Sequence, residues 1–320
     1  MDRPVPIPIE NRKFHIQAAL VYAAFLAFSS IGLRRASIVM PFAGTLLIVV
    51  AILAPLPAYW HQKHRSDRRE AVLALFWVLA FGFTLPFVVY VCARLGMPLQ
   101  DLNLARLDHM LGVNVPAIAA WTDRHPFAQI VSDTYPLLVY YFLPAAILLP
   151  VLFGRWMAAR EFLIANVIGV ILGLTAFAFL PAVGPWYGYH VPPDIGQAFC
   201  QSQLLTMRTP GPYIAQEAGV VCFPSFHVIW AILCARALST FRTIRIPACV
   251  FAGMIVLSTV TTGWHYFVDV LGGIAIAHIS IAIASRIVES QSRPACAAAT
   301  AQVARAATVI AFPSLGTVGE

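Results

Sequence analysis

The sequence predicts an all-α fold: a polytopic membrane helical bundle with about eight transmembrane helices. Hydrophobic residues make up 60% of the 320 residues and charged residues only 11%, about half the charged share of a soluble domain. A soluble protein of this length could not bury so much apolar surface, whereas a bilayer requires it. The net charge of +7 comes from basic residues in short loops, a pattern that indicates membrane orientation and argues against nucleic-acid binding.

Long apolar segments recur along the chain and define the predicted spans. Two N-terminal transmembrane helices are expected within residues 14–60, and six more within residues 71–288. The first segment is too long for a signal peptide, and no clear small-residue cleavage site follows it. The predicted spans are residues 14–33, 37–60, 71–94, 127–153, 161–180, 224–238, 246–262 and 264–287.

The segments between and beyond these spans are polar or mixed. Residues 1–13 are polar and rich in proline, and we expect them to be disordered. Residues 95–125 indicate a loop with an interfacial helix, and residues 181–223, dense in Pro, Gly, Tyr and Gln, a long loop. Residues 289–320 form a C-terminal tail, which we do not expect to cross the membrane because its apolar part contains an arginine.

The basic residues predict the orientation of the bundle. With the N-terminus in the cytoplasm, 15 of the 21 Lys and Arg residues fall on the cytoplasmic side. Both termini are then cytoplasmic, and the long loop, His227 and His265 share the extracytoplasmic face, periplasmic or lumenal. The basic residues left on that face are Arg34, Arg35, Arg94, Arg106, Arg124 and Arg208.

Two short stretches carry the residues that suggest chemistry. They are residues 222–228 (CFPSFHV) and 261–269 (TTGWHYFVD), each with a histidine where a loop enters an apolar segment. His265 and Asp269 are four residues apart, so on a helix they share one face and the carboxylate can orient the imidazole. His227 would supply an acid for a leaving group. Because helix N-termini attract anions, this set of side chains suggests phosphate chemistry.

Other uses of these residues stay open at this point. A zinc site built from His227, His265 and Asp269 is conceivable, although no fourth ligand motif lies nearby. Cys200 and Cys222 fall in the same outer loop and could form a disulfide in an oxidising compartment. The remaining histidines and the tryptophans at span ends are most simply solvated or interfacial side chains.

The stretches PSFH (224–227) and HYFVDVLGG (265–273) resemble two signatures of the type 2 phosphatidic acid phosphatase superfamily. The resemblance covers residues 71–288, which would form a six-helix phosphatase-like core, with residues 14–60 as an N-terminal addition. It implies that His265 attacks phosphorus, that Asp269 orients His265 and that His227 protonates the leaving alcohol. It also implies that neither a metal nor another cofactor takes part.

Three departures from the phosphatase branch resemble instead the inositol phosphorylceramide synthase and sphingomyelin synthase branch. Residues 177–186 (FAFLPAVGPW) contain no cation where the phosphatases carry a lysine and an arginine. Thr259 stands where the phosphatases have an arginine, and Phe226 where they have a glycine. The resemblance therefore implies a head-group transferase more closely than a phosphatase.

Charge gives a separate argument for that branch. A phosphate monoester carries close to two negative charges near neutral pH, whereas a phosphodiester carries one. Without the expected cations, helix N-termini, backbone N–H groups and Ser225 remain, and these suffice for a monoanion. Arg106, Arg124 and Arg208 could still reach the site from the outer loops. We assign substrate binding to Ser225, Tyr266, Trp186 and Arg208.

The sequence thus predicts a metal-independent lipid head-group phosphotransferase or phosphodiesterase, inositolphosphotransferase-like, with a phosphohistidine at His265. Its partners would be a membrane phospholipid donor and a lipid alcohol acceptor. One alternative is a lipid phosphate phosphatase acting on phosphatidate or a polyprenyl diphosphate. Another is a non-catalytic membrane scaffold, but the complete set of His227, His265 and Asp269 argues against it. Head group, acceptor lipid and oligomeric state are not predicted.

Overall fold

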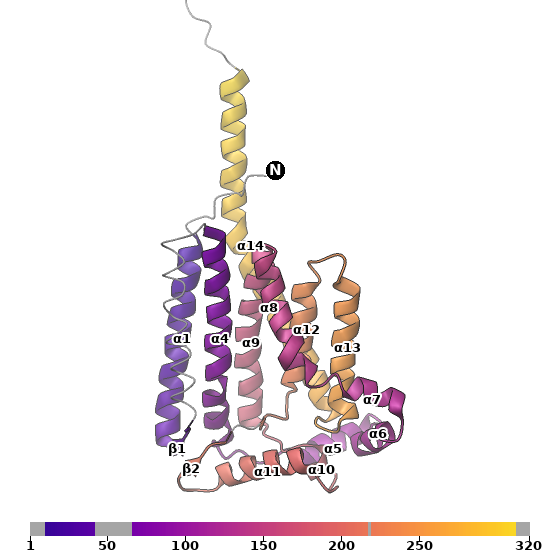
Figure 1. The fold of residues 1–320 in the computed structure, drawn as a ribbon. Helices are drawn as coiled ribbons and strands as arrows, with labels where there is room; N and C mark the ends of the chain where they lie inside the picture. Colours follow the sequence, from indigo (N-terminus) through magenta and orange to yellow (C-terminus); the bar gives the residue numbers. More distant parts are fainter. Residues whose placement is uncertain (1–9, 42–65, 217–218, 312–320) are drawn as a thin grey trace, which may run out of the picture.

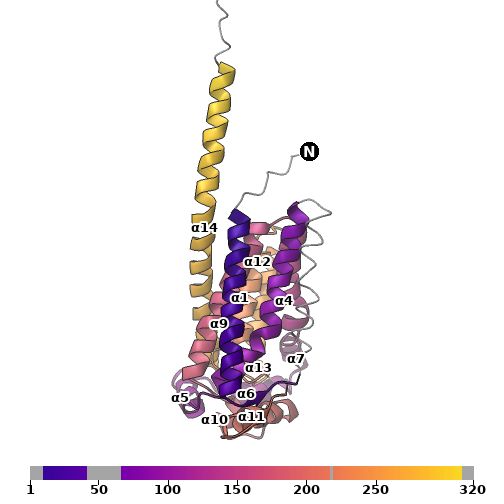
Figure 2. The ribbon, with the colours of Figure 1, turned by 90° about the vertical axis from the view of Figure 1, so that its left-hand side faces the viewer.

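The computed structural model describes residues 10–41, 66–216 and 219–311. Long helices stand side by side as a bundle, and a layer of short helices covers one end of it (Figure 1). Helix α14 projects beyond the opposite end of the bundle, as Figures 1 and 2 both show. Within these residues the regular structure is helical except for two strands of two residues each, which agrees with the predicted all-α class.

The bundle is built from long apolar helices. A π-helical turn, η1 (Leu138–Phe142), leads directly into α8. The bundle helices are α1 (Glu10–Arg35), α4 (Ser66–Ala93), α8 (Leu143–Leu152), α9 (Trp156–Phe179), α12 (Phe226–Leu238), α13 (Arg245–Thr261) and α14 (Phe267–Ala311).

Shorter elements connect the bundle helices, and most of them lie in the predicted loops 95–125 and 181–223. Strands β1 (Ile38–Val39) and β2 (Tyr213–Ile214) pair in parallel, with Ile38 opposite Tyr213, and so tie the end of α1 to the long loop. The short helices are α5 (Asp101–Met110), α6 (Val115–Thr122), α7 (Pro126–Ser132), α10 (Pro185–Gly188) and α11 (Ile195–Arg208).

Three helical segments of the described chain are long and apolar enough to cross a membrane by length and composition. They are His15–Arg35, Trp156–Phe179 and Phe267–Ser290; shorter apolar segments are Leu79–Ala93, Leu138–Leu152, Phe226–Leu238 and Arg245–Thr261. These segments indicate a membrane protein, but the predicted count of eight spans is not confirmed. Of the predicted span 37–60, residues 42–60 lie outside the described residues, and Ile38–Val39 form β1.

Two predicted spans differ in extent from the helices of the structure. Span 127–153 is divided, because α7 ends at Ser132 and residues 133–136 form turns before the helical backbone resumes. Pro136 accounts for the break, since proline has no N–H and disfavours helix in the residue before it. The last span continues as α14 to Ala311, so the predicted tail is helical up to that residue, as its alanine-rich sequence favours.

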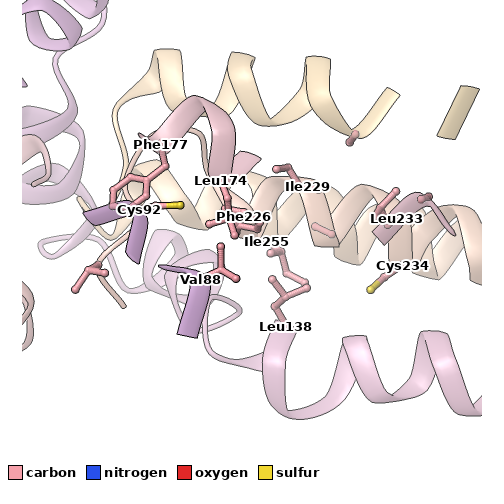
Figure 3. Close-up of a cluster of buried hydrophobic side chains, with 14 of the residues drawn as sticks. Val88, Cys92, Leu138, Leu174, Phe177, Phe226, Ile229, Leu233, Cys234 and Ile255 are labelled. Atoms are coloured by element: carbon pink, nitrogen blue, oxygen red, sulfur yellow. The ribbon is translucent and has the colours of Figure 1, made fainter. Parts of the chain in front are cut away.

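Helix α12 lies in the middle of the bundle, packed against α8, α9, α13 and α14. Its side chains Phe226, Ile229 and Leu233 join Leu174 and other core residues of the neighbouring helices (Figure 3). The close approach of α14 to the start of α12 depends on Gly273, where an added Cβ would lie 2.8 Å from the Ser225 carbonyl oxygen. The start of α12, with His227, is thereby held against the start of α14, with Asp269.

The starts of α12 and α14 lie at the covered end of the bundle, beside α5, α6, α10 and α11 (Figure 1). The start of α1 and the projecting end of α14 lie at the other end. The start of α1 and the end of α14 are therefore separated from the histidines by the length of the bundle. Which side is cytoplasmic stays a prediction.

Candidate active site

His227 and His265 meet at the covered end of the bundle. His227 is the second residue of α12, and His265 lies two residues before α14. Their ring centroids are 6.0 Å apart and their ring planes are tilted by 56°. Both rings line a cavity of about 350 Å³, together with Tyr135, Trp186 and Trp264. The two histidines that the sequence singled out therefore face one cavity.

Two oxygen atoms converge on Nδ1 of His265. The backbone carbonyl oxygen of Cys222 lies 3.0 Å from Nδ1, and Oδ2 of Asp269 lies 3.4 Å from it. Because a carbonyl and a carboxylate only accept hydrogen bonds, they favour the tautomer that carries its proton on Nδ1. The lone pair of Nε2 is then available as a nucleophile or base.

Asp269 is fully buried, and its Oδ2 collects several donors. The backbone N–H of Tyr266 donates to Oδ2 over 2.9 Å, and the thiol of Cys222 donates over 3.1 Å. Oδ1 has no hydrogen-bond partner among the described residues. A positive charge beside a buried carboxylate stabilises it, the more so when one of its oxygens has no hydrogen-bond partner. When Nε2 of His265 forms a new bond, the imidazole becomes positively charged and supplies that stabilisation.

Tyr135, which also lines the cavity, packs directly against the ring of His227. The two rings are stacked, with centroids 4.0 Å apart and an interplanar angle of 16°. Trp264, the neighbour of His265, continues the stack at 6.3 Å from Tyr135. Tyr135 lies just before η1, and π-helical turns recur at functional sites. Sequence analysis did not single out Tyr135, because it lies inside an apolar segment without a motif.

Asp101, the first residue of α5, is buried and anchors the loop that leads into α10. Its Oδ1 accepts hydrogen bonds from the backbone N–H groups of Val183 and Gly184, each over 2.9 Å. The Tyr266 hydroxyl lies 3.0 Å from the same oxygen and 2.8 Å from the carbonyl oxygen of Gly184. Burial raises the pKa of Asp101. Tyr266, adjacent to His265, is thus tied to the layer that covers the bundle.

Asp108, two turns further along α5, caps the start of α14. Its carboxylate oxygens accept hydrogen bonds from the backbone N–H groups of Phe267 and Val268 over 2.8 and 2.9 Å. Burial raises the pKa of Asp108 to about 6. Asp101 and Asp108 are seven residues apart and so lie on one face of a helix, a signal that could have identified them from the sequence.

The four residues assigned to substrate binding have different positions. Trp186 lines the cavity. Ser225 is fully buried and caps the first turn of α12, and Tyr266 is fully buried in its bonds to Asp101 and Gly184. Arg208 donates to backbone carbonyl oxygens near the end of α4. The structure therefore does not place Ser225, Tyr266 or Arg208 at the cavity wall, because each is occupied in holding the backbone.

No lysine or arginine lines this cavity within the described ranges. Arg94, like Arg208, donates to backbone carbonyl oxygens, and the side chains of Arg106 and Arg124 are exposed to solvent. None of these four arginines lines the cavity. Among the described residues, the groups that remain to face an anion in the cavity are the two imidazoles and the N-terminal end of α12, an arrangement suited to an anion of low charge.

Cys200 and Cys222, suggested as a disulfide pair, are both unpaired. Cys222 instead joins His265 and Asp269 in a buried group whose ligand atoms all lie within 4.8 Å of one another. This group, rather than the set with His227, could hold a metal ion. Burial raises the pKa of the Cys222 thiol, which opposes metal binding because the thiolate is the ligand.

A protein-family model described as the PAP2 superfamily matches residues 102–283, more than half of the chain. The match contains both histidine stretches and all of the helices from η1 to α13, whereas α1 and α4 precede it. No curated protein and no solved structure matches the chain.

Proposed function

The chain belongs to the PAP2 superfamily, and from this premise we propose that it transfers a lipid head group through a phosphohistidine intermediate on His265. Membership of the superfamily itself indicates phosphatase or phosphotransferase chemistry. The observation that carries the proposal is the setting of His265. Its Nδ1 faces two acceptors, while its ring lines the same cavity as His227.

The reaction has two displacements at phosphorus. In the first, Nε2 of His265 attacks a lipid phosphodiester, and the bond from phosphorus to the oxygen of the lipid alcohol breaks. His227 gives a proton to that oxygen, so the alcohol leaves neutral. The Asp269 carboxylate balances the positive charge that develops on His265. In the second displacement, an acceptor hydroxyl gives its proton to His227 and attacks phosphorus, and the phosphorus–nitrogen bond breaks.

The charge around the cavity supports a diester as donor. A dianionic monoester held away from water needs cationic side chains such as arginine clamps. The cavity wall has none among the described residues, and the N-terminal end of α12 supplies only a partial charge. One uncompensated charge in a partly buried site costs on the order of 1.4 kcal/mol or more, which corresponds to about a ten-fold preference for the diester.

The aromatic wall supports transfer rather than hydrolysis. Tyr135, Trp186 and Trp264 line the cavity beside the two histidines. Trp186 and Trp264 meet edge to face with ring centroids 5.5 Å apart. Exclusion of water by such a wall protects a reactive intermediate from hydrolysis and leaves it to an acceptor alcohol. We therefore favour a lipid alcohol as acceptor, with a phospholipid as donor.

The test compares two donors with identical acyl chains, phosphatidylinositol and phosphatidate, each incubated with purified protein and ceramide as acceptor. We expect a new phosphodiester from phosphatidylinositol, formed at least about ten-fold faster than inorganic phosphate from phosphatidate. The variant His265→Ala controls for contaminating activity. Release of phosphate from phosphatidate or a polyprenyl diphosphate, with the diester left intact, would contradict the transferase assignment and favour a lipid phosphate phosphatase.

A further inference from the structure

A second cavity, of about 520 Å³, lies within the bundle itself. Its wall is formed by α1, α4, η1 with α8, α9 and α12, and includes Phe25, Leu79, Leu143 and Val170. The lining is apolar except for Asn166, whose side-chain oxygen already accepts a hydrogen bond from the indole N–H of Trp230 over 2.9 Å. Apolar cavities do not hold ordered water, so the chemistry of the wall calls for a hydrocarbon occupant.

This cavity adjoins the one that contains the histidines. Leu85 of α4 and Trp230 of α12 line both cavities. Trp230 follows His227 by three residues, so both side chains lie on the same side of α12. The hydrogen bond to Asn166 fixes the indole of Trp230 at the junction. An elongated ligand could therefore place one end beside the histidines and the other end among the bundle helices.

The second cavity also opens sideways out of the bundle. Four of its lining residues are exposed apolar side chains: Val21 at 43%, Val139 at 46%, Leu148 at 36% and Ile171 at 56%. They come from α1, η1, α8 and α9, the part of the molecule that a bilayer would surround. The occupant could thus enter from the hydrocarbon region of a membrane without crossing water.

We propose that this cavity binds one long hydrocarbon chain of the lipid substrate while its phosphate lies between His227 and His265. The inference rests on the proposed function, because it names where that substrate's chain lies. Lipid tails are as apolar as the cavity wall, so little affinity is gained by moving a chain from bilayer to cavity. The cavity instead selects substrates by the length and shape of the chain. Helices α1 and α4, which precede the family match, form one wall and so contribute to that selection.

Gly82 of α4 offers a direct way to fill the cavity. It lines the cavity, and a Cβ added to it would meet no atom within 4 Å, so Gly82→Phe can project its ring into the space. Gly253→Phe is the matched control. Gly253 is exposed on α13, an added Cβ there also meets nothing within 4 Å, and it lines neither cavity.

The first measurement is photo-crosslinking with a phosphatidylinositol that carries a diazirine near the end of one acyl chain, in a His265→Ala background so that no turnover is needed. We expect labelled peptides from α1 and α4, with labelling reduced on the order of ten-fold by Gly82→Phe and unaffected by Gly253→Phe. Labelling that is absent from α1 and α4, or that is equal in the two glycine variants, would overturn the proposal. Thermal unfolding of each detergent-solubilised variant confirms that it is folded.

The second measurement is the ratio of turnover with dioleoyl to turnover with dioctanoyl phosphatidylinositol. We expect Gly82→Phe to lower this ratio on the order of ten-fold, and Gly253→Phe to leave it unaltered. An unaltered ratio in Gly82→Phe would also overturn the proposal. The two proposals can be told apart by their failures. Crosslinks to α1 and α4 without turnover of any diester would contradict the proposed function and support the cavity as a binding site for the chain. Turnover of a diester without those crosslinks would support the proposed function and contradict the role of the cavity.

Discussion

The imidazole of His265 is oriented by the peptide backbone as well as by a carboxylate. The Cys222 carbonyl oxygen lies closer to Nδ1 than Asp269 does. The spacing of four residues predicted a contact with Asp269 on the premise that both residues lie on one helix. The contact is present, but His265 precedes α14 by two residues and reaches Asp269 from the loop. The contact with Cys222 joins residues 43 positions apart and depends on how the loop before α12 folds. That fold has no local signature in the sequence.

The stacking of Tyr135 on His227 leads to a prediction about His227, the proposed general acid. Tyr135→Phe keeps a stacked ring, whereas Tyr135→Ala removes it, and an aromatic pair contributes on the order of 0.5–1.5 kcal/mol beyond its buried area. We expect Tyr135→Ala to lower kcat several-fold and to shift the pH profile of kcat, because the His227 ring loses its support and gains contact with water. Tyr135→Phe should keep most of kcat and the wild-type profile.

Initial rates across a pH series, with membrane insertion of each variant confirmed, check this prediction. Equal losses in the two Tyr135 variants would indicate that the hydroxyl matters and not the stacked ring. A drop in rate without any change in the pH profile would indicate a structural role alone.

At the scale of elements, α5 acts as a brace across the covered end of the bundle. Asp101 holds the loop before α10 and the Tyr266 hydroxyl, and Asp108 holds the first N–H groups of α14. The residues that these two carboxylates hold near the site, Tyr266, Phe267 and Val268, directly follow His265 in the chain. A carboxylate at a helix N-terminus also interacts favourably with the helix dipole. The brace therefore connects the layer of short helices to the geometry of the candidate active site.

The raised pKa of Asp108 predicts that the stability of the folded protein falls as the pH rises. Its pKa is raised from 3.8 to about 6 in the folded protein, so the folded state keeps a proton that the unfolded state has already lost. The stability that this group contributes is present below about pH 4 and is lost as the pH rises through about 6. Asp108→Asn removes the titration, so the difference in Tm, wild type minus variant, should decrease from pH 5 to pH 7.5.

Thermal unfolding in one detergent at both pH values measures this difference. Asp133→Asn serves as a control, since Asp133 is exposed and lies outside α5. A difference in Tm that grows with pH would contradict the assigned direction of the Asp108 shift.

Two residues beside the candidate catalytic histidines show which roles could not be predicted from the sequence. Ser225 and Tyr266 sit inside the two histidine stretches, and their place there suggested contact with substrate. In the structure they hold the backbone instead, as the N-cap of α12 and the link to Asp101. Asp108 reaches Phe267 across 159 positions, a contact that no periodicity within one segment reports. Local spacing thus predicted the contact between His265 and Asp269, although only Asp269 lies on α14, and the contacts between distant elements required the fold.

At the scale of the whole molecule, the histidines lie at one end of the bundle and the start of α1 and the end of α14 at the other (Figure 1). The distribution of basic residues predicts that the histidine end is extracytoplasmic. Ser202 on α11 and Thr243 in the α12–α13 connection are both exposed and lie at opposite ends of the bundle. They provide a matched pair of labelling sites.

In a background without the native cysteines, Ser202→Cys should react with an impermeant thiol reagent in intact cells. Thr243→Cys should react only after the membrane is opened. Blotting for the labelled protein measures both. The reverse pattern would place the histidines in the cytoplasm and refute the orientation taken from the basic residues.

The central claim, a covalent intermediate on His265, is tested most directly by trapping it. Purified protein is mixed with phosphatidylinositol labelled with ³²P, without acceptor, quenched in alkali and digested. We predict an acid-labile label on the peptide that contains His265, lost in His265→Ala and retained in His278→Ala, a substitution on α14 outside the cavity. Added ceramide should discharge the label into a new phosphodiester. Turnover of the donor with no label on His265, or with the label on His227, would contradict the account.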